Sequence, residues 1–531
     1  MTDRKLPRRG FLAASTAALA APRIAQGQNS RVLKFIPQSD LGTLDPIWTT
    51  VYVVGAHGMM VFDTLYGLDS DYLPQPQMAE GHKVEDGGKT WSITLRPGLL
   101  WHDGERVLAK DCVASIRRWG VRDGFGQTLM AATDAIEAPD DRTIRFRLKH
   151  PFPLLTAALG KTGPNICVMM PERLALTDPF KQMNEMVGSG PFRFVHKEHL
   201  TGSRIVYERN QAYVPRPNGT PSLTAGPKIV HFDRVEWHIL PDVASAAAAM
   251  RTGEMDWWEN PTYDLLPSLR QSKNLTVTRM NGFGSMAGMR FNHLHPPFNN
   301  AALRRAILGA VDQEEFMTAV ATEDKRNWTA GVGFFTPGSA MPTSAGMEVL
   351  SGKRDLDAVK RAVEASGYKG EKAVVPVAPE YASFAALGNV GVDMMRKIGL
   401  NVELRTADWG SIQRALTSAE PVEKGGWSVY LTHPSGLDFA DPATHYWLRS
   451  NGRAASRGWP DSPKIEALRD EWLVTPDLAG RQRLAADMQR QAFVDVPYIP
   501  LGQALGSTVF QNHVKDIVTG AGPLFWGVRK A

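Results

Sequence analysis

Apolar and polar residues alternate with a period of two in several short stretches of the chain, which is the pattern of a strand with one buried face. The clearest examples lie at 90–96 and at 141–150. The same reading predicts strands within 31–40, 187–198, 203–214, 231–240, 401–408 and 427–432. The segments at 187–198 and 203–214 follow a glycine-rich turn and are expected to form a hairpin.

Other stretches repeat their apolar residues at helical spacing. From Lys110 onward, Val113, Ile116 and Trp119 share one face, and further helices are expected at 54–65 and in the alanine-rich segment after 241. One helix is predicted to start near 298 and another over 355–367, the latter with Asp355 as its N-cap and Gly367 as its stop. Strands that alternate with helices in this way indicate a mixed α/β protein.

The triplet Gly88-Lys89-Thr90 raises the question of a phosphate-binding P-loop. A P-loop needs a glycine five positions before Gly88, where this chain has Lys83. A P-loop lysine also opens a helix, whereas Lys89 is followed by an alternating strand and preceded by the Asp-Gly and Gly-Gly pairs of a tight turn. The triplet is therefore interpreted as the corner of a β-hairpin.

The formal charge of +5 is concentrated at the N-terminus. Residues 1–27 hold five basic residues and one acid, so the remainder has 55 basic and 54 acidic residues. A nearly neutral body gives no electrostatic case for a nucleic-acid partner. No stretch approaches the ~18 apolar residues of a membrane span, so no stable membrane insertion is expected.

The first 27 residues have the layout of an export signal, with a basic start, an apolar alanine-rich run and small residues near Ala25 and Gly27. Arg8 and Arg9, followed by Gly-Phe-Leu, resemble the twin-arginine signal of bacteria. The alternative is a cytoplasmic amphipathic helix, which the uncharged run disfavours. We expect a soluble protein exported to the periplasm of a Gram-negative bacterium.

Cys112 and Cys167 are the only cysteines, so no disulfide framework holds the fold. An oxidising compartment would permit one bridge. The pattern places Cys112 on the apolar face of a helix and Cys167 in an apolar strand, which favours two separately buried thiols.

The segment 73–119, "LPQPQMAEGHKVEDGGKTWSITLRPGLLWHDGERVLAKDCVASIRRW", resembles the signature of family 5 solute-binding proteins of ABC transporters, the oligopeptide-, dipeptide- and nickel-binding group. Other segments fit the same family in the same order, namely "LDP" at 44–46, "GSGPFRF" at 188–194, "PFNNAALRRAILGAVDQEEF" at 297–316, "RDLDAVKRAVEASGY" at 354–368, "ADWGS" at 407–411 and "FADP" at 439–442. The resemblance spans essentially the whole chain after the leader.

This resemblance implies a two-lobed α/β fold of the periplasmic binding protein type (class II, cluster C), with an extra domain inserted in the first lobe. The first lobe would comprise 31–63, 186–275 and 499–531, the extra domain 64–185 and the second lobe 276–498. Such a protein would act as a monomer without a cofactor, close over a small solute or short peptide and deliver it to a membrane permease.

In the peptide-binding relatives, an aspartate in an Asp-aromatic-x-acid-Pro turn neutralises the amino group of the ligand. The resemblance puts Asp438 at that position, in "DFADP" at 438–442. The alternative is that Asp438 or Asp441 caps a following helix at 443–448, and this interpretation is preferred for Asp441. The relatives usually carry a tryptophan three residues before the aspartate, where this chain has Ser435, which weakens the assignment to peptides.

Other candidate ligand contacts come from segments that line the cleft in relatives. They lie after "LDP", in "NGFGSMAGMRFNH" at 281–293 and around 427–439. The full candidate set is Trp48, Thr50, His57, Phe283, Met286, Arg290, Trp427, Tyr430, Asp438 and Phe439. Any of them could instead be an ordinary core or surface residue.

A metal site and an enzyme are the alternatives. His293, His295, His433 and His445 show no tight i, i+4 pair and no Cys/His set with structural-metal spacing, so no metal ligand is predicted, although import of a nickel or metal chelate stays open. The chain has no HExxH motif, and "GSMAG" at 284–288 does not form a nucleophile elbow, because Phe283 stands where the first glycine is required. We therefore expect no catalytic residues, with a peptide hydrolase as the remote alternative.

Overall fold

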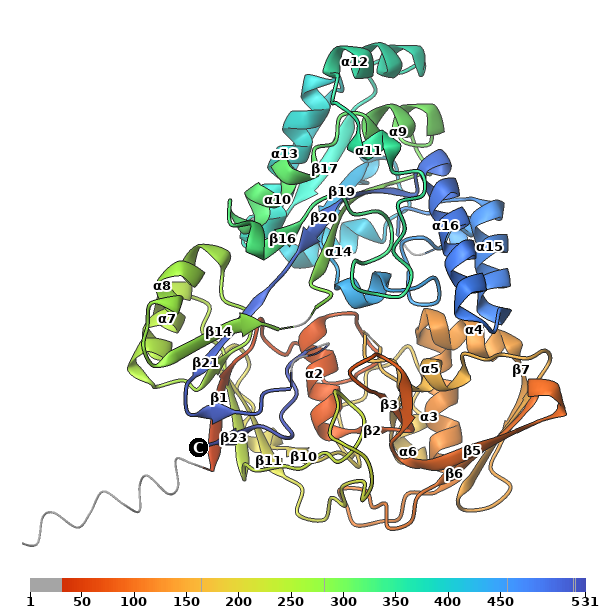
Figure 1. The fold of residues 1–531 in the computed structure, drawn as a ribbon, viewed down its shortest axis with the longest axis vertical. Helices are drawn as coiled ribbons and strands as arrows, with labels where there is room; N and C mark the ends of the chain where they lie inside the picture. Colours follow the sequence, from red (N-terminus) through yellow and green to blue (C-terminus); the bar gives the residue numbers. More distant parts are fainter. Residues whose placement is uncertain (1–30, 164, 281, 456, 519, 521) are drawn as a thin grey trace, which may run out of the picture.

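The computed structural model describes residues 31–531 apart from 164, 281, 456, 519 and 521. The expected export signal at 1–27 lies outside these residues. The chain forms two lobes, one above the other in Figure 1. The lower lobe contains the elements β1–β14, β21–β23 and α2–α8, and the upper lobe contains β15–β20 and α9–α16. Among the described residues, no helix combines the length and apolarity needed to cross a membrane.

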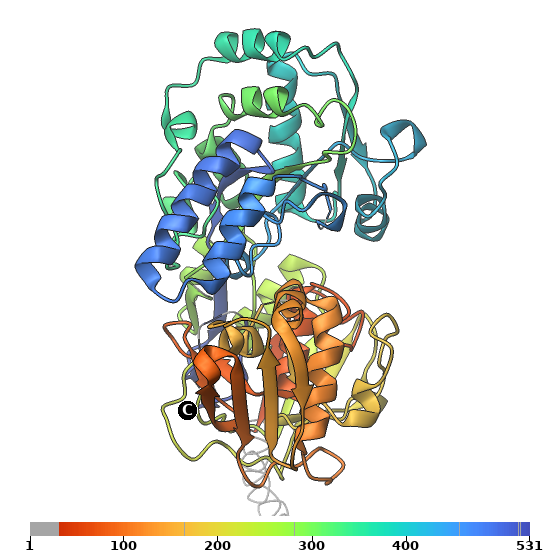
Figure 2. The same cartoon turned by 90° about the vertical axis from the view of Figure 1, so that its right-hand side faces the viewer.

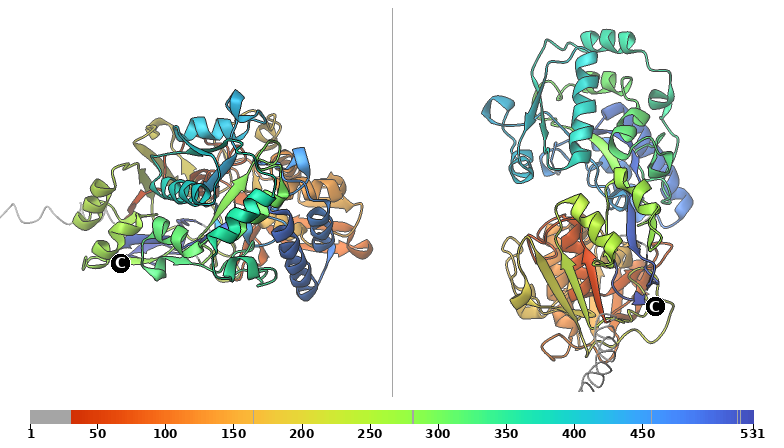
Figure 3. Two further views of the ribbon diagram at one scale, coloured as in Figure 1. Left: turned by 90° about the horizontal axis from the view of Figure 1, so that it is seen from above. Right: turned by 90° about the vertical axis from the view of Figure 1, so that its left-hand side faces the viewer.

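A seven-stranded mixed sheet is the centre of the lower lobe (Figure 3, right). The central strand β1 pairs in parallel with β12 and β13, and the other neighbouring strands of this sheet pair antiparallel. The strand order is β10 (Phe192–Phe194), β11 (Arg204–Arg209), β12 (Arg234–His238), β1 (Val32–Ile36), β13 (Trp257–Trp258), β21 (Ser507–Gln511) and β14 (Leu275–Arg279). The helices of this part are α2 (Tyr52–Val61), α7 (Val243–Thr252) and α8 (Leu266–Arg270). The predicted hairpin of β10 and β11 is confirmed.

A four-stranded antiparallel sheet forms the other half of the lower lobe, with α3 beside it (Figure 2). Its order is β5 (Ala79–Glu85), β6 (Thr90–Leu95), β8 (Thr143–Leu148) and β7 (Thr133–Glu137). The accompanying elements are α3 (Ala109–Arg122), α4 (Gly124–Ala132), α5 (Leu155–Gly160), α6 (Glu172–Ala175) and the two-stranded pairs β2 (Asp63–Thr64) with β9 (Val168–Met169) and β3 (Tyr66–Leu68) with β4 (Pro74–Pro76).

The Gly88-Lys89-Thr90 triplet lies at the turn from β5 to β6, so the hairpin interpretation is confirmed. Gly87 and Gly88 have φ of 63° and 93° there, in the left-handed region that favours glycine. Cys112 and Cys167 are both free and buried, which confirms the prediction of two separate thiols.

The upper lobe is built on a four-stranded antiparallel sheet and a parallel strand pair. The sheet order is β16 (Trp328–Thr329), β20 (Tyr498–Ala504), β15 (Ser285–Phe291) and β19 (Val429–Thr432), and the pair is β17 (Ala373–Val377) with β18 (Val402–Thr406). The helices are α9 (Ala301–Leu308), α10 (Gln313–Ala321), α11 (Glu348–Ser351), α12 (Leu356–Ala365), α13 (Ala382–Lys397), α14 (Trp409–Leu416), α15 (Pro463–Val474) and α16 (Leu478–Asp495). The last pair, β22 (Val514–Lys515) with β23 (Arg529–Lys530), lies in the lower lobe.

Two chain segments cross between the lobes, from β14 to β15 and from β20 to β21 (Figure 1). They run close together at Gly284, which has φ of 50°. A Cβ atom on Gly284 would lie 2.1 Å from the carbonyl oxygen of Ala504, so this contact requires glycine. The division of the chain into 31–63, 64–185, 186–275, 276–498 and 499–531 stays a prediction.

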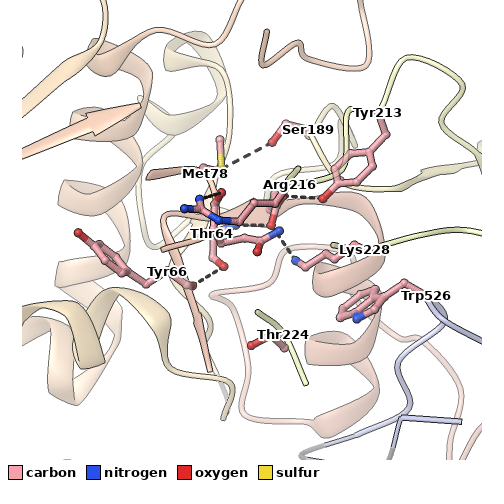
Figure 4. A network of polar contacts seen from close by, with 12 residues as sticks. Thr64, Tyr66, Met78, Ser189, Tyr213, Arg216, Thr224, Lys228 and Trp526 are labelled. Atoms are coloured by element: carbon pink, nitrogen blue, oxygen red, sulfur yellow. Dashed lines mark hydrogen bonds and ion pairs between the residues drawn. The ribbon is translucent and has the colours of Figure 1, made fainter. Parts of the chain in front are cut away.

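A buried polar network joins the two halves of the lower lobe (Figure 4). Lys228 Nζ lies 2.7 Å from Asp63 Oδ1, and both side chains are almost fully buried. The Tyr213 hydroxyl donates to Asp63 Oδ2 at 3.1 Å, and the Lys228 ammonium lies 4.7 Å from the ring centre of Trp526. Because a buried charge is costly unless paired, this network ties the C-terminal segment and the 213–228 segment to β2.

Two helix predictions need correction. The helix expected near 298 is two helices, because Asn300 caps α9 only from Ala301 and Asp312 starts a new N-terminus by accepting hydrogen bonds from Glu314 N and Glu315 N. The helix expected over 54–65 begins at Tyr52 and ends at Val61. Helix α12 is confirmed, with Asp355 accepting from two backbone N–H groups and Gly367 in the left-handed conformation.

Candidate ligand-binding site between the lobes

Asp438 lies on a short 3-10 turn (Gly436–Phe439) that follows strand β19. Ser435 begins the turn by accepting a hydrogen bond from Leu437 N at 3.3 Å. The Thr336 hydroxyl donates to the carbonyl of Gly436 at 2.6 Å. Gly436 packs so closely on the Phe283 carbonyl that a Cβ would lie 2.0 Å from it. The turn is thus held against the segment that crosses between the lobes.

The carboxylate of Asp438 is buried between the lobes. The side chain is 7% exposed, and a Cβ atom on Gly163 of the lower lobe would lie 2.9 Å from Asp438 Oδ1. None of the described residues donates a hydrogen bond to this carboxylate. Burial raises the pKa of Asp438 to about 7, an effect that Lys161 opposes and Asp123 reinforces.

Lys161 offsets the charge of Asp438 only in part, because its ammonium group is paired directly with Asp123 Oδ2. Both members of this ion pair are largely buried in the lower lobe. The three charges together leave one negative charge uncompensated, and Asp438 is the carboxylate without a partner.

Tyr52 and Glu259 add to the polar character of the lower wall. Burial raises the pKa of the Tyr52 phenol well above its usual value, and the nearby charges of Asp438 and Glu259 add to the rise. Glu259 is 4% exposed, and burial raises its pKa to about 7, although Gln38 N donates to Glu259 Oε2 at 2.8 Å. Asp438 and Glu259 therefore both place negative charge near the Tyr52 hydroxyl.

A cationic region lies deeper in the upper lobe. The Arg290 guanidinium, on β15, is 5.1 Å from the ring centre of Trp447, and burial lowers its pKa to about 9. Arg457 donates to Gln413 Oε1 at 2.6 Å. Tyr446 connects the two ends of the site, because burial and the charge of Asp438 raise its pKa while Arg290 and Arg457 lower it.

Two aromatic residues lie next to these groups, because Tyr430 pairs with Arg290 across the sheet and the Phe283 carbonyl packs on Gly436 of the Asp438 turn. Phe283 stacks on Tyr72 of the lower lobe with ring centres 4.5 Å apart, which is a direct contact between the lobes. Tyr430 lies on β19 with its ring centre 6.5 Å from Trp409, and burial raises its pKa to about 12.

The remaining candidates from the sequence are dispersed. His57 is fully buried in the lower-lobe core, with Tyr207 and Met186 against its ring nitrogens at 2.9 and 3.3 Å. Three others are packed in upper-lobe cores, namely Met286, Trp427 and Phe439. Trp48 lies below the Arg122 guanidinium at 5.0 Å, and Thr50 is exposed. Their roles in ligand binding stay predictions.

Asp441 acts as a local cap. Its carboxylate accepts hydrogen bonds from Ala443 N at 2.8 Å and Thr444 N at 3.1 Å. The helix expected at 443–448 is wrong, because this segment forms turns. The hydrogen bonds to Asp441 close one turn at Pro442. The residues that follow do not continue it as a helix, because a single turn is not stable without further helical hydrogen bonds.

Four residues of the site escaped the sequence analysis: Tyr52, Lys161, Glu259 and Thr162, which lines a pocket together with Tyr52 and Gly163. Tyr52 lies between the candidates Thr50 and His57 in the expected cleft segment, so this position was the only signal available. The other three lie in stretches without a motif.

The histidines do not form a metal centre in the described part of the chain, where no three His, Cys, Asp or Glu residues are grouped to hold an ion. His433 lies 2.7 Å from the Ser383 hydroxyl, and His445 lies 2.9 Å from the carbonyl of Phe334.

Comparison with known proteins decides the family. The profile of the bacterial extracellular solute-binding proteins, family 5 (middle), matches residues 74–456. The chain is also 35% identical over 524 residues to the probable peptide ABC transporter periplasmic-binding protein y4tO of Sinorhizobium fredii, covering 98% of both chains. The chain belongs to the family 5 solute-binding proteins.

Solved structures of other binding proteins have the same fold as this chain. The protein AgaA of A. tumefaciens R10, in complex with agropinic acid, superposes with a TM-score of 0.79 at 18% identity and covers 94% of this chain and 99% of that one. A dipeptide-binding protein from Pseudoalteromonas sp. SM9913, in complex with Met-Leu, gives a TM-score of 0.75 at 19% identity, with 94% and 100% covered. The two-lobed α/β architecture expected from the sequence is confirmed.

Proposed function

We propose that this family 5 protein is the periplasmic substrate-binding subunit of an ABC importer. It captures a short peptide or another small amine-bearing solute by closing its lobes and delivers it, as a monomer, to a membrane permease. The observation that carries the ligand class is the carboxylate of Asp438, buried between the lobes with no hydrogen-bond donor among the described residues.

A buried carboxylate without a partner is costly, because it loses its hydration and gains nothing in return. An ammonium group would restore both the charge balance and the hydrogen bonds, and charge-assisted hydrogen bonds are the strong ones. Lys161 does not serve this purpose while Asp123 holds it. A ligand that supplies the missing cation therefore binds the closed state better than the open one and shifts the population toward closure.

The other end of the site supports a ligand with an anionic or polar group. Arg290 and Arg457 lie close enough to Tyr446 to lower its pKa, and Asp438 lies close enough to raise it. We assign the ligand contacts to Asp438, Arg290, Phe283 and Tyr430, which line this region. Aromatic side chains provide large contact area at modest entropic cost.

The names of related proteins support a peptide or peptide-like ligand but do not identify it. The Sinorhizobium relative is described as a probable peptide-binding protein, and an Escherichia coli relative, 24% identical over 503 residues, as a probable D,D-dipeptide-binding protein.

We infer from the leader that this protein is exported to the periplasm of a Gram-negative bacterium by the twin-arginine route.

The test is a thermal-shift screen of the purified protein against dipeptides, longer peptides, amino-acid conjugates and nickel chelates, repeated with Asp438→Asn. Binding to the folded state raises the melting temperature in proportion to the logarithm of ligand excess over Kd. We expect an amine-bearing solute to stabilise the wild type and not the variant, whereas Asp355→Asn, at an exposed helix cap, keeps the response. A response to nickel chelates alone, or one that survives Asp438→Asn, would contradict the proposal.

A further inference from the structure

The hydroxyl groups of Tyr52 and Thr162 are buried in the lower lobe without a hydrogen-bond partner among the described residues. A buried hydroxyl with no partner costs free energy, and such groups are few in native proteins. Both side chains line one narrow pocket, together with Gly163 and Met59. Two unpartnered hydroxyls in one pocket point to a group that a ligand supplies.

Asp438 lies at the edge of this pocket. Gly163 is a wall residue of the pocket, and its position beside Asp438 Oδ1 leaves no room for a Cβ. The charge of Asp438 reaches the Tyr52 hydroxyl, and Ser435, at the start of the Asp438 turn, lies close to the same group. The carboxylate and the two hydroxyls therefore offer three acceptors from three separate segments of the chain.

The pocket itself is small and mostly apolar. Its free volume is about 20 Å³, which is the space of one water-sized group. Leu223, Pro523 and Leu524 form the wall beyond the hydroxyls. A methyl-sized group fits this space, and an aromatic side chain does not.

We propose that Tyr52 and Thr162 are ligand contacts that, with Asp438, form a three-acceptor site for a primary ammonium group, and that the adjoining pocket takes a small apolar substituent on the neighbouring carbon. A primary ammonium carries three N–H donors on a tetrahedral nitrogen, which matches one carboxylate and two hydroxyls. This inference rests on the proposed function and adds selectivity to it: the charge of Asp438 attracts any cation, and the hydroxyls select one with N–H donors.

The experiment uses isothermal titration of the whole protein with three probes. Ala-Ala has a primary ammonium and a methyl side chain, N,N,N-trimethyl-Ala-Ala keeps the charge but has no N–H donor, and Trp-Ala keeps the ammonium but has a large side chain. We expect Ala-Ala to bind at least 10-fold more tightly than the trimethyl form, since a hydrogen bond to a charged group is worth about that factor. It should also bind more tightly than Trp-Ala, because the indole ring does not fit the small pocket.

The variants Tyr52→Phe and Thr162→Val separate the hydroxyls from the charge. Each should weaken Ala-Ala binding by about 10-fold and leave trimethyl-Ala-Ala unchanged. Their melting temperatures without ligand should be unchanged or higher, because each loses a buried hydroxyl that has no partner. Tyr368→Phe is the matched control: its hydroxyl donates to the Glu371 carbonyl at 2.8 Å in the upper lobe, so it should lower stability and keep the affinity.

The outcomes distinguish this inference from the proposed function. Wild-type protein that binds none of the probes would contradict the proposed function and this inference with it. If Ala-Ala binds and Asp438→Asn abolishes binding, but Tyr52→Phe and Thr162→Val bind as well as the wild type, the inference alone is overturned. Equal affinity for Ala-Ala and its trimethyl form would overturn it too.

Discussion

Replacing Asp438 with asparagine is predicted to stabilise the ligand-free protein at neutral and alkaline pH. The carboxyl group has a pKa of about 7 in the folded protein against 3.8 as its ordinary value, because burial disfavours the charged form. Below pH 3.8 the group is protonated in both states and costs nothing. As the pH rises from 3.8 to 7, the unfolded chain ionises first, so the folded state loses stability, and above pH 7 the loss stays constant.

The size of this loss follows from the pKa difference. Three pKa units correspond to about 4 kcal/mol at 1.36 kcal/mol for each unit. The linkage relation gives a loss of about 1.7 kcal/mol at pH 5 and about 4 kcal/mol at pH 8. Asparagine has nearly the same shape and never ionises, so Asp438→Asn should exceed the wild type in stability by up to these amounts.

Urea denaturation followed by tryptophan fluorescence at pH 5 and pH 8 measures the difference. Asp355→Asn serves as the control, because an asparagine caps the helix as well as an aspartate and this side chain is exposed; its stability should follow the wild type at both pH values. The reasoning is refuted if Asp438→Asn is less stable than the wild type at pH 8, or if its advantage does not grow between pH 5 and pH 8.

Three further predictions concern the scaffold. Lys228→Met removes the partner of the buried Asp63 and should lower the free energy of unfolding by about 3–5 kcal/mol, measured by urea denaturation; a loss below 1 kcal/mol would contradict a role for this pair. Gly284→Ala places a Cβ against the neighbouring backbone at positive φ and should cost more than about 1 kcal/mol, seen as a lower melting temperature, whereas an unchanged one would show that the crossing segments can separate. Burial raises the pKa of both thiols, Cys112 and Cys167, so neither should react with Ellman's reagent at pH 8 until the protein is denatured; rapid labelling of the native protein would contradict this.

Local sequence patterns predicted the elements whose stability depends on their own residues. Strand β8 alternates so that Ile144, Phe146 and Leu148 are buried, and a period of two can be read without knowing the partner strands. Helix α12 carries its own start and stop in Asp355 and Gly367, since caps act on backbone groups within one turn.

The errors occurred where a competing local signal ended a helix. The run from 298 to 316 has helical spacing throughout, yet Asp312 begins a second helix by capping Glu314 and Glu315. After Asp441, the capped turn is not continued. A cap is equally compatible with a helix and with an isolated turn, and packing of the following residues decides between them.

The sequence by itself determined the family, the α/β class and the position of Asp438, because each depends on residues that are close together in the chain. The tertiary structure alone decided which groups face that carboxylate. Tyr52, Thr162, Glu259 and Asp438 come from separate segments that meet where the lobes close. The physical reason is that an alternating or helical pattern shows only which face of a strand or helix is buried. A binding site depends on contacts between residues far apart in the sequence, and such contacts leave no periodic pattern in the chain.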